Sequence, residues 1–546
     1  MRNCLIAIVL ATCAAACSGS DNTERNEAAI DAVLGKNVRT HMEVLAADAM
    51  QGREAGTAGY EVAADYVAGQ LREYGLEPLG DDGSYFQGIE FSETRLIPES
   101  ATLSLSKDGE TLALEFPADF VRSGGYGKAR EQIEAPLVFV GHGIIAPEYD
   151  HDDYAGVDVE GKILVMLSGA PPEFDTDQRA FYSSSSGKAE RAVELGAVGI
   201  VGIRTPVDQA RRPWARFLPG IGSPGMRWLD DHGRPFHGNP ELAGSATLSE
   251  TGADKLFALA GYDLAAIFDK HAKGETGSFD LGVSADLARV STQRIVPSAN
   301  VVAVLRGSDP ALANEYVVYS AHLDHIGIRP SETGDEIHNG AYDNAAGIGT
   351  VLEIAAAMAA MPEAPRRSVI FALVTAEEKG LQGSSYFAKN PPVPVEQLVA
   401  NINIDMPYLG FPVADIHAFG AEHSTLYAAV SAATEAMDVG LTPDPLPAEV
   451  RFVRSDQFSF VQEGIPALAF KAGSQSSDPA IDGAAALDDF LKNHYHQASD
   501  DLNLPWSEVG GERFARTALL LGLIVADQDE RPVWNKGDFF GDKFAR

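Results

Sequence analysis

The 546-residue chain has almost no cysteine, and its three cysteines, Cys4, Cys13 and Cys17, all lie at the N-terminal end. Beyond Cys17 the sequence therefore excludes disulfides, thiolate metal ligands and cysteine nucleophiles. A G-x-S-x-G motif is also missing, which disfavours a serine hydrolase built on a nucleophile elbow. Basic residues are few: 42 Lys and Arg face 78 Asp and Glu, for a formal net charge of -36. This charge argues against nucleic acid as a partner and indicates a well-solvated surface.

Long apolar runs are absent after the N-terminus, so we expect no membrane-spanning helix in the body of the chain. The first seventeen residues combine Arg2, a short apolar run and small residues before Cys17, as a secretory signal does. The stretch 14–17 (AAAC) resembles a bacterial lipobox. We therefore expect a lipoprotein-type signal peptide over residues 1–17 and a polar tether over residues 18–26. An ordinary cleaved signal with incidental cysteines is the alternative.

This N-terminus predicts export to the bacterial cell envelope. The protein would be lipid-anchored in the periplasm or outer membrane, and its only contact with the membrane would be the lipid on Cys17. The sequence carries no indication of oligomeric state.

After Asn300 the chain alternates apolar strands with amphipathic helices. Examples are the strand-like run EYVVYSAHLD and the helix expected from Ala346 to Met361. This alternation predicts an α/β fold with a mostly parallel sheet and helices on both faces. Between about Val121 and Val290 the pattern changes to β runs, Pro- and Gly-rich loops and one clear helix, which indicates a separate domain.

Acids and histidines follow several of the apolar strands or open a helix. In parallel sheets, ligands gather at the carboxyl ends of strands, so we expect these side chains to meet. The residues that we predict as metal ligands are His322, Asp343, Glu378, Asp405 and His496. A lone H-x-D or a lone Glu-Glu pair is usually structural, and the conjunction of five such positions carries the prediction.

Charge counting favours two divalent ions over one. The carboxylates of Asp343, Glu378 and Asp405 supply three negative charges, and a bridging hydroxide would balance two divalent cations. Five protein ligands are too many for one catalytic zinc, which must keep an open position. Oxygen and imidazole ligands suit a pair of Zn²⁺ ions, with Mn²⁺ or Co²⁺ as possible substitutes.

Three further residues have predicted roles beside the ligands. We expect Glu377 to be the general base and acid next to the ligand Glu378. Asp324 lies two residues after His322, so we expect Asp324 to hold that imidazole in one tautomer. Tyr495 could donate its hydroxyl to a developing oxyanion. Three nearby histidines are interpreted as neighbours rather than ligands: His325, His338 and His494.

These motifs resemble the zinc-dependent aminopeptidase family, which includes bacterial leucyl and broad-specificity aminopeptidases and glutamate carboxypeptidase. The resemblance lies in HLDH from His322, AYDNAAG around Asp343, the pair Glu377-Glu378, NIDM around Asp405 and YHQASD around His496. It implies that one ion takes His322 and Asp405 and that the other takes Glu378 and His496. Asp343 would bridge them, and the roles given above to Glu377, Asp324 and Tyr495 would follow.

The segment GHGIIAPEYDHDDYAGVDVEGKILVML, with KAERAVELGAVGIV, resembles the protease-associated domain that several family members carry within the peptidase fold. The resemblance implies a peptidase domain in two parts, residues 27–120 and 291–546, interrupted by a protease-associated domain over residues 121–290. One departure from the family is Gln457, which follows Ser455-Asp456 where a histidine is frequent, and we expect it to alter a pocket wall.

The sequence thus predicts a secreted di-zinc exopeptidase that removes N-terminal residues from peptide substrates. Within the same fold a carboxypeptidase or a glutaminyl cyclase with a single zinc remains open. A non-catalytic binding protein, as the transferrin receptor is in this broader group, is the alternative from another class.

Overall fold

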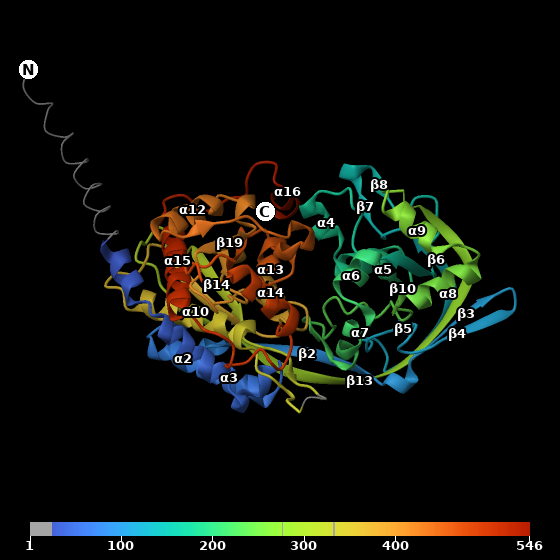
Figure 1. Cartoon of the computed structure of the whole chain (residues 1–546), viewed down its shortest axis with the longest axis horizontal. Helices are drawn as coiled ribbons and strands as arrows, with labels where there is room; N and C mark the ends of the chain where they lie inside the picture. The colour runs from blue at the N-terminus through green and yellow to red at the C-terminus, as the bar shows by residue number, and fades with distance from the viewer. Residues whose placement is uncertain (1–23, 276, 331–333) are drawn as a thin grey trace, which may run out of the picture. The chain divides into compact units, whose positions relative to one another are not determined.

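The computed structural model describes residues 24–275, 277–330 and 334–546 (Figure 1). The chain folds into two compact units. Unit 1 takes the residues up to Ile89 together with Pro297–Pro447 and Arg451–Arg546. Unit 2 takes Glu90–Val296 and Ala448–Val450. The unit that carries the predicted ligands is therefore interrupted in sequence by the other.

The boundaries of the interruption differ from those predicted. Unit 2 begins at Glu90 and ends at Val296, whereas residues 121 and 290 were expected. Strand pairing gives the reason, because residues 91–94 pair with 225–228 and residues 102–106 pair with 284–288. The alternating strands before residue 121 thus complete the sheet of unit 2. That unit 2 is a protease-associated domain stays a prediction.

The predicted tether also ends earlier than expected. Residues 24–32 are helical, so residues 24–26 belong to the folded unit and not to a tether. Arg25 is buried there and forms an ion pair with Asp527. The predicted signal peptide, with Cys17, lies outside the described residues.

Unit 1 is built on a sheet whose centre is parallel. The strands lie in the order β1-β13-β17-β14-β18-β21-β19-β20, and β17, β14, β18 and β21 run parallel to one another. Every residue of β14, β17 and β18 is buried, as expected for strands covered on both faces. The predicted mostly parallel α/β fold is confirmed. The strands are β1 (Glu77–Pro78), β14 (Tyr316–His322), β15 (Gly327–Ile328), β16 (Ile337–His338), β17 (Ser368–Val374), β18 (Leu398–Asn403), β19 (Asp415–Phe419), β20 (Gly440–Leu441), β21 (Ala467–Ala472) and the end of β13 (Ser278–Leu305).

One face of this sheet packs against helices α2, α3, α10 and α15 in a single hydrophobic core. Helix α10 is Ala-rich and almost completely buried, and it lies close to α2: a Cβ on Gly349 would be 2.7 Å from the Val38 carbonyl oxygen. Elsewhere α11 packs against α13 through Phe387 and Phe460. The helices of unit 1 are α2 (Gly35–Leu45), α3 (Ala58–Glu73), α10 (Ala346–Ala359), α11 (Gln382–Lys389), α12 (Leu426–Ala436), α13 (Gln457–Gln462), α14 (Gly483–Asn493), α15 (Glu508–Asp527) and α16 (Phe539–Phe544).

Unit 2 has its own mixed sheet. Strands β6, β9, β10 and β12 are parallel, and antiparallel strands β3, β4, β5 and β13 extend them. The predicted helix and buried strand are α5 and β10. The elements are β2 (Phe86–Leu96), β3 (Thr102–Lys107), β4 (Glu110–Leu114), β5 (Phe120–Val121), β6 (Arg130–Val140), β7 (Ile145–Ala146), β8 (His151–Asp152), β9 (Ile163–Leu167), α4 (Thr176–Tyr182), α5 (Ser185–Glu194), β10 (Gly199–Ile203), α6 (Pro206–Arg211), α7 (Trp214–Phe217), β11 (Gly225–Trp228), β12 (Ala246–Leu248), α8 (Glu250–Ala260), α9 (Leu264–His271) and β13.

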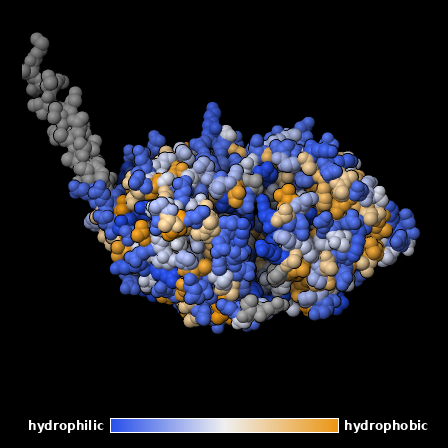
Figure 2. Space-filling model, in the orientation of Figure 1, coloured by the Kyte–Doolittle hydropathy of each residue, from blue (hydrophilic) through white to orange (hydrophobic). Residues whose placement is uncertain are grey.

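Hydrophilic side chains cover much of the surface in the view of Figure 2, as the excess of acidic residues predicts. In the described parts of the chain, each helix is too short or too polar to cross a membrane.

Candidate metal centre

The predicted ligands of unit 1 meet at the carboxyl ends of its parallel strands. His322 is the last residue of β14, and Asp405 lies two residues after the end of β18. Glu378 follows β17 by four residues. These strands are neighbours in the sheet, so their ends lie side by side, as the sequence predicted.

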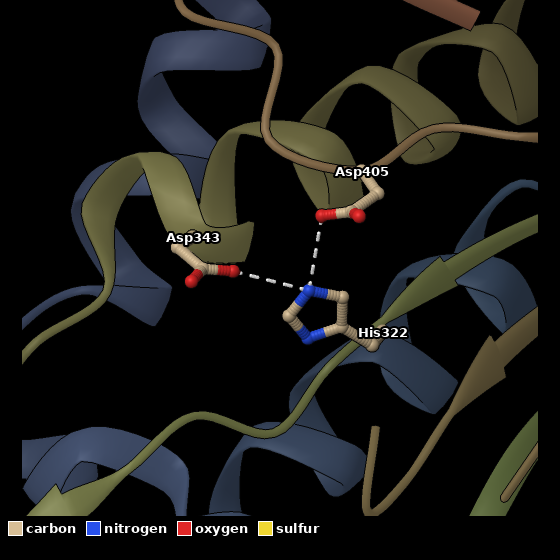
Figure 3. Close-up of side chains that lie close together, drawn as sticks. All are labelled: His322, Asp343 and Asp405. Carbon is tan, nitrogen blue, oxygen red and sulfur yellow. Dashed lines mark hydrogen bonds and ion pairs between the residues drawn. The ribbon is translucent and has the colours of Figure 1, made fainter. Parts of the chain in front are cut away.

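His322 lies between two carboxylates (Figure 3). Its Nε2 is 3.1 Å from Oδ1 of Asp343 and 3.2 Å from Oδ1 of Asp405. All three residues are buried, and one ligand atom from each lies within 4.8 Å of the others. Two ligands bound about 2.0–2.1 Å from a tetrahedral zinc lie roughly 3.3 Å apart, so the spacing of these donor atoms fits one such ion.

The second oxygen of Asp343 faces a different histidine. Its Oδ2 lies 3.2 Å from Nε2 of His496, and that same nitrogen lies 3.2 Å from Oε2 of Glu378. Asp343 therefore presents one oxygen to His322 and the other to His496. Asp343 is thereby the one acid shared by both groups of potential metal ligands among the described residues.

His325, interpreted from the sequence as a neighbour of the ligands, also lies at this centre. It is completely buried, and its Nδ1 is 2.9 Å from Oε1 of Glu378 and 3.9 Å from Oδ2 of Asp343. Together with these two acids it forms a second group of side chains that could hold a metal. His325 is thus a direct neighbour of two predicted ligands.

The other two histidines that were set aside have different surroundings. His494 Nδ1 lies 2.9 Å from the Ser499 hydroxyl, and His494 Nε2 lies 3.6 Å from Asp489. His338 lies in the short strand β16, and burial lowers its pKa to about 4. Neither belongs to the two groups of possible ligands found among the described residues.

Asp324 contacts the ring of His322 through its main chain. The His322 Nδ1 nitrogen is 3.0 Å from the main-chain carbonyl oxygen of Asp324, so this carbonyl, and not the carboxylate, accepts the bond that orients the ring. The carboxylate of Asp324 instead accepts hydrogen bonds from the amides of Glu377, at 3.0 Å, and Glu378, at 3.3 Å. It is fully buried, and burial raises its pKa to about 7. Asp324 therefore holds the main chain of the acidic pair.

Glu377 and Tyr495 lie beside the ligands. Burial raises the pKa of the Glu377 carboxyl well above its usual range against the opposing effect of His322, and the carboxylates of Asp456 and Glu378 raise it further. The ring of Tyr495 lies 3.9 Å from that of His496, centroid to centroid. Burial raises the pKa of the Tyr495 hydroxyl, and Asp343 and Glu378 add to the rise.

Gln457, which we expected to alter a pocket wall, lies in the interior of unit 1. It is fully buried, accepts a hydrogen bond from Asn403 Nδ2 at 2.9 Å and donates to the Phe452 carbonyl. Asn403 is the last residue of β18, so Gln457 ties the start of α13 to a strand that leads to Asp405. Gln457 therefore supports the end of strand β18, which precedes Asp405.

The fold and this centre define a metallopeptidase of the α/β exopeptidase type. The sequence places it further: residues 300–519 match the family model described as Peptidase family M28, and this part of the chain is a domain of that family. The predicted family and enzyme class are thereby confirmed. Every predicted site residue lies within the matched range.

The chain is also similar to individual known proteins. Aminopeptidase NAALADL1 of Mus musculus is 32% identical over 136 residues, which make up 24% of this chain and only 16% of that protein. An aminopeptidase from Aneurinibacillus sp. strain AM-1 has a similar fold, with a TM-score of 0.54, 18% identity and coverage of 94% of this chain and 99% of that one. BSAP, a zinc aminopeptidase from Bacillus subtilis, aligns with 91% of this chain and 96% of its own, at 17% identity and a TM-score of 0.46.

Proposed function

We propose that this protein is an exported di-zinc aminopeptidase that hydrolyses the N-terminal peptide bond of peptides. The observation that carries the proposal is the position of Asp343, whose two carboxylate oxygens each lie beside a different histidine. A carboxylate shared in this way serves two ions rather than one. The names of the relatives, an aminopeptidase in mouse and another in Aneurinibacillus, support the substrate class.

The ligands divide into two sets around Asp343. His322 and Asp405 would hold one ion, and Glu378 and His496 the other. His325 lies near enough to Glu378 to be an additional or alternative nitrogen ligand of the second ion. When bound, zinc ions supply an activated water and polarise the scissile carbonyl; Mn²⁺ or Co²⁺ could substitute.

Glu377 is proposed as the residue that moves protons. Its main chain is fixed by Asp324, and its neighbour Glu378 takes the ligand position, which leaves the Glu377 carboxylate free of metal. It would accept a proton from the attacking water and deliver it to the amine of the leaving group. Tyr495, half-buried next to His496, would donate its hydroxyl to the oxyanion that forms on the carbonyl.

Three alternatives differ in measurable ways. A glutaminyl cyclase would need a single zinc, and a carboxypeptidase would release the residue from the opposite end of the peptide. A binding protein without catalysis would have no use for a protonatable Glu377 beside a complete ligand set. Elemental analysis of the purified chain gives the number of zinc ions and so tests for a glutaminyl cyclase. Hydrolysis of a panel of amino-acid anilides and of C-terminally blocked peptides distinguishes an aminopeptidase from a carboxypeptidase and from a binding protein.

The cellular setting is proposed from the N-terminal sequence. The arginine, apolar run and small residues before Cys17 support export and a lipid on that cysteine, which would anchor the enzyme in the bacterial cell envelope. Peptides in the envelope would be the substrates. The strongly acidic composition supports the absence of nucleic acid as a partner.

The proposed mechanism is tested by Glu377→Gln. Since the amide cannot accept the proton, we expect kcat on an amino-acid anilide to fall by about 10²–10⁴-fold while two zinc ions per chain are retained. Glu363→Gln, at an exposed position of the same unit, is the control and should leave both quantities unchanged. An active Glu377→Gln enzyme with its metals bound would show that another group moves the proton.

A further inference from the structure

The predicted ligand Asp343 lies in a segment whose backbone has no regular helical or strand conformation. It belongs to the short turn Ala341–Ala345, and its φ and ψ of -113° and 87° are not helical. His496 likewise has a φ of 60°, in the left-handed region. Both side chains nevertheless reach the same oxygen-rich centre. Other contacts must therefore hold these two loops in place.

Asp500 supplies such contacts from the loop of His496. Its carboxylate accepts hydrogen bonds from the amide of Tyr342, at 2.9 Å, and from the amide of Asp343, at 3.0 Å. Its main-chain carbonyl accepts a third from the amide of Ala341, at 3.1 Å. Three successive amides of the Asp343 turn thus bond to one residue. The side chain is completely buried, so water cannot replace these bonds.

Arg53 holds the same turn from the preceding residues. Its guanidinium donates to the carbonyl oxygens of Asn339, at 2.6 Å, and Gly340, at 3.0 Å, and its Nε donates to that of Leu323, at 2.9 Å. Leu323 directly follows the ligand His322. Arg53 is completely buried, and the charge of Asp500 stands first among those that stabilise its cationic form against burial.

We infer that Asp500, supported by Arg53, is the positioning residue of the metal centre. By bonding the turn of Asp343 to the loop of His496, it sets the bridging carboxylate and the last histidine relative to each other. Asp500 does not touch the ions or the substrate. It acts through the main chain of the bridging ligand, and its removal should affect both ions because Asp343 serves both. The inference rests on the proposed two-zinc function.

The test compares Asp500→Asn with Asp501→Asn in the full chain. The asparagine at 500 keeps one acceptor oxygen and puts an NH₂ group against the second amide, so the turn loses at least one bond. Asp501 is a matched control, because it is the next residue along the chain and its carboxylate bonds to Asn503, at 2.8 and 2.9 Å, and not to the turn of Asp343. Zinc affinity is measured by competition with a chromogenic chelator, and the melting temperature of the metal-free protein is measured alongside.

We expect Asp500→Asn to weaken zinc binding about 10–100-fold at both ions, with kcat partly restored by excess zinc. The control should bind zinc as the wild type does. A lower melting temperature of the metal-free Asp500→Asn protein with wild-type zinc affinity would show a purely structural role and overturn the inference. If the asparagine variant does not fold, Asp500→Glu decides: it keeps both acceptors but displaces them, and an unchanged zinc affinity overturns the inference.

The two proposals fail in different ways. A wild-type chain that binds no zinc overturns the proposed function and this inference together. A zinc-binding wild type whose Asp500→Asn variant binds zinc equally well overturns the inference alone.

Discussion

Both units contain parallel strands whose carboxyl ends carry polar residues, but the contacts of these residues differ between the two units. In unit 1 the ends of β14, β17 and β18 present His322, Glu378 and Asp405. His322 and Asp405 belong to one group of potential metal ligands and Glu378 to the other, and Asp343 belongs to both. In unit 2 the ends of β6 and β9 lie near Asp153 and Lys188, whose polar atoms bond to main-chain groups.

In unit 2, Asp153 and Lys188 form hydrogen bonds with the main chain near the strand ends. One oxygen of Asp153 accepts hydrogen bonds from the amides of His142, at 2.9 Å, and Ile144, at 3.0 Å. The buried Lys188 donates to the carbonyls of Leu167 and Gly169. Strand ends of this kind are common to both sheets, but in unit 1 several carboxylates lie around the histidines His322 and His496. Both groups of potential metal ligands found in the described residues are in unit 1.

The largest expected effect comes from removing the bridge in unit 1. Asp343→Ala should lose both zinc ions together, because each ion loses a ligand, and kcat/KM should fall by about 10⁴-fold or more as the ions' contribution disappears. Elemental analysis and anilide hydrolysis measure the two effects. Glu336→Ala, an exposed acid in the same unit, is the control. Retention of one tightly bound zinc would contradict the bridging role.

An intermediate effect, on stability alone, is expected in unit 2. Asp153→Ala leaves two buried amides without an acceptor and should lower the free energy of unfolding by about 2–5 kcal/mol. Zinc content and kcat of the folded enzyme should not change. Denaturant titration and anilide assays at 25 °C test this, with the exposed Glu160→Ala as control. A loss of turnover in the folded variant would mean that the strand ends of unit 2 also serve the chemistry.

The smallest effect concerns acid sensitivity in unit 2. His142 is buried with its Nε2 at 2.9 Å from Nδ1 of His271, and burial lowers the pKa of His142 well below 6.5, with Lys188, His271 and His151 adding to the decrease. Below pH 6.5 the unfolded chain therefore binds a proton that the folded chain does not. The contribution of His142 to the free energy of unfolding is therefore fully present above pH 6.5 and is lost as the pH falls below that value. The loss amounts to about 1.4 kcal/mol for each unit by which the pKa of His142 differs between the folded and unfolded chain.

His142→Asn should reduce this pH dependence of the unfolding free energy between pH 6.5 and 5, measured by denaturant titration. The exposed His232→Asn is the control and should keep the wild-type slope. An identical slope in wild type and His142→Asn would show that the buried histidine pair does not control the acid response.

Much of the centre could be predicted because its ligands follow apolar strands, a local pattern in the sequence. The sequence could not show which atoms of a residue point where. Asp324 illustrates this, since its carbonyl and not its carboxylate faces His322. Arg53 and Asp500 were missed altogether, because their partners are main-chain atoms, some of them more than 150 residues away, and no motif marks them.

The unit boundaries were misplaced for a related reason. Strand β13 is 28 residues long and belongs to unit 2 at its start and to unit 1 at its end. A composition change marks where loops and helices begin, but a strand can pass from one sheet to another without any change in its alternation. The pairing of residues 102–106 with 284–288, which decides the boundary, is visible only in three dimensions.

Helix α2 gives the chain an unusual order of assembly. Its buried residues Val38, Met42 and Leu45 belong to the core shared with α10 and α15, which are made more than 300 residues later. During synthesis, unit 2 has all of Glu90–Val296 available before α10 exists. The apolar face of α2 therefore remains exposed to solvent while unit 2 folds. Helix α2, although near the start of the peptidase unit, must be among the last elements to reach its final stability.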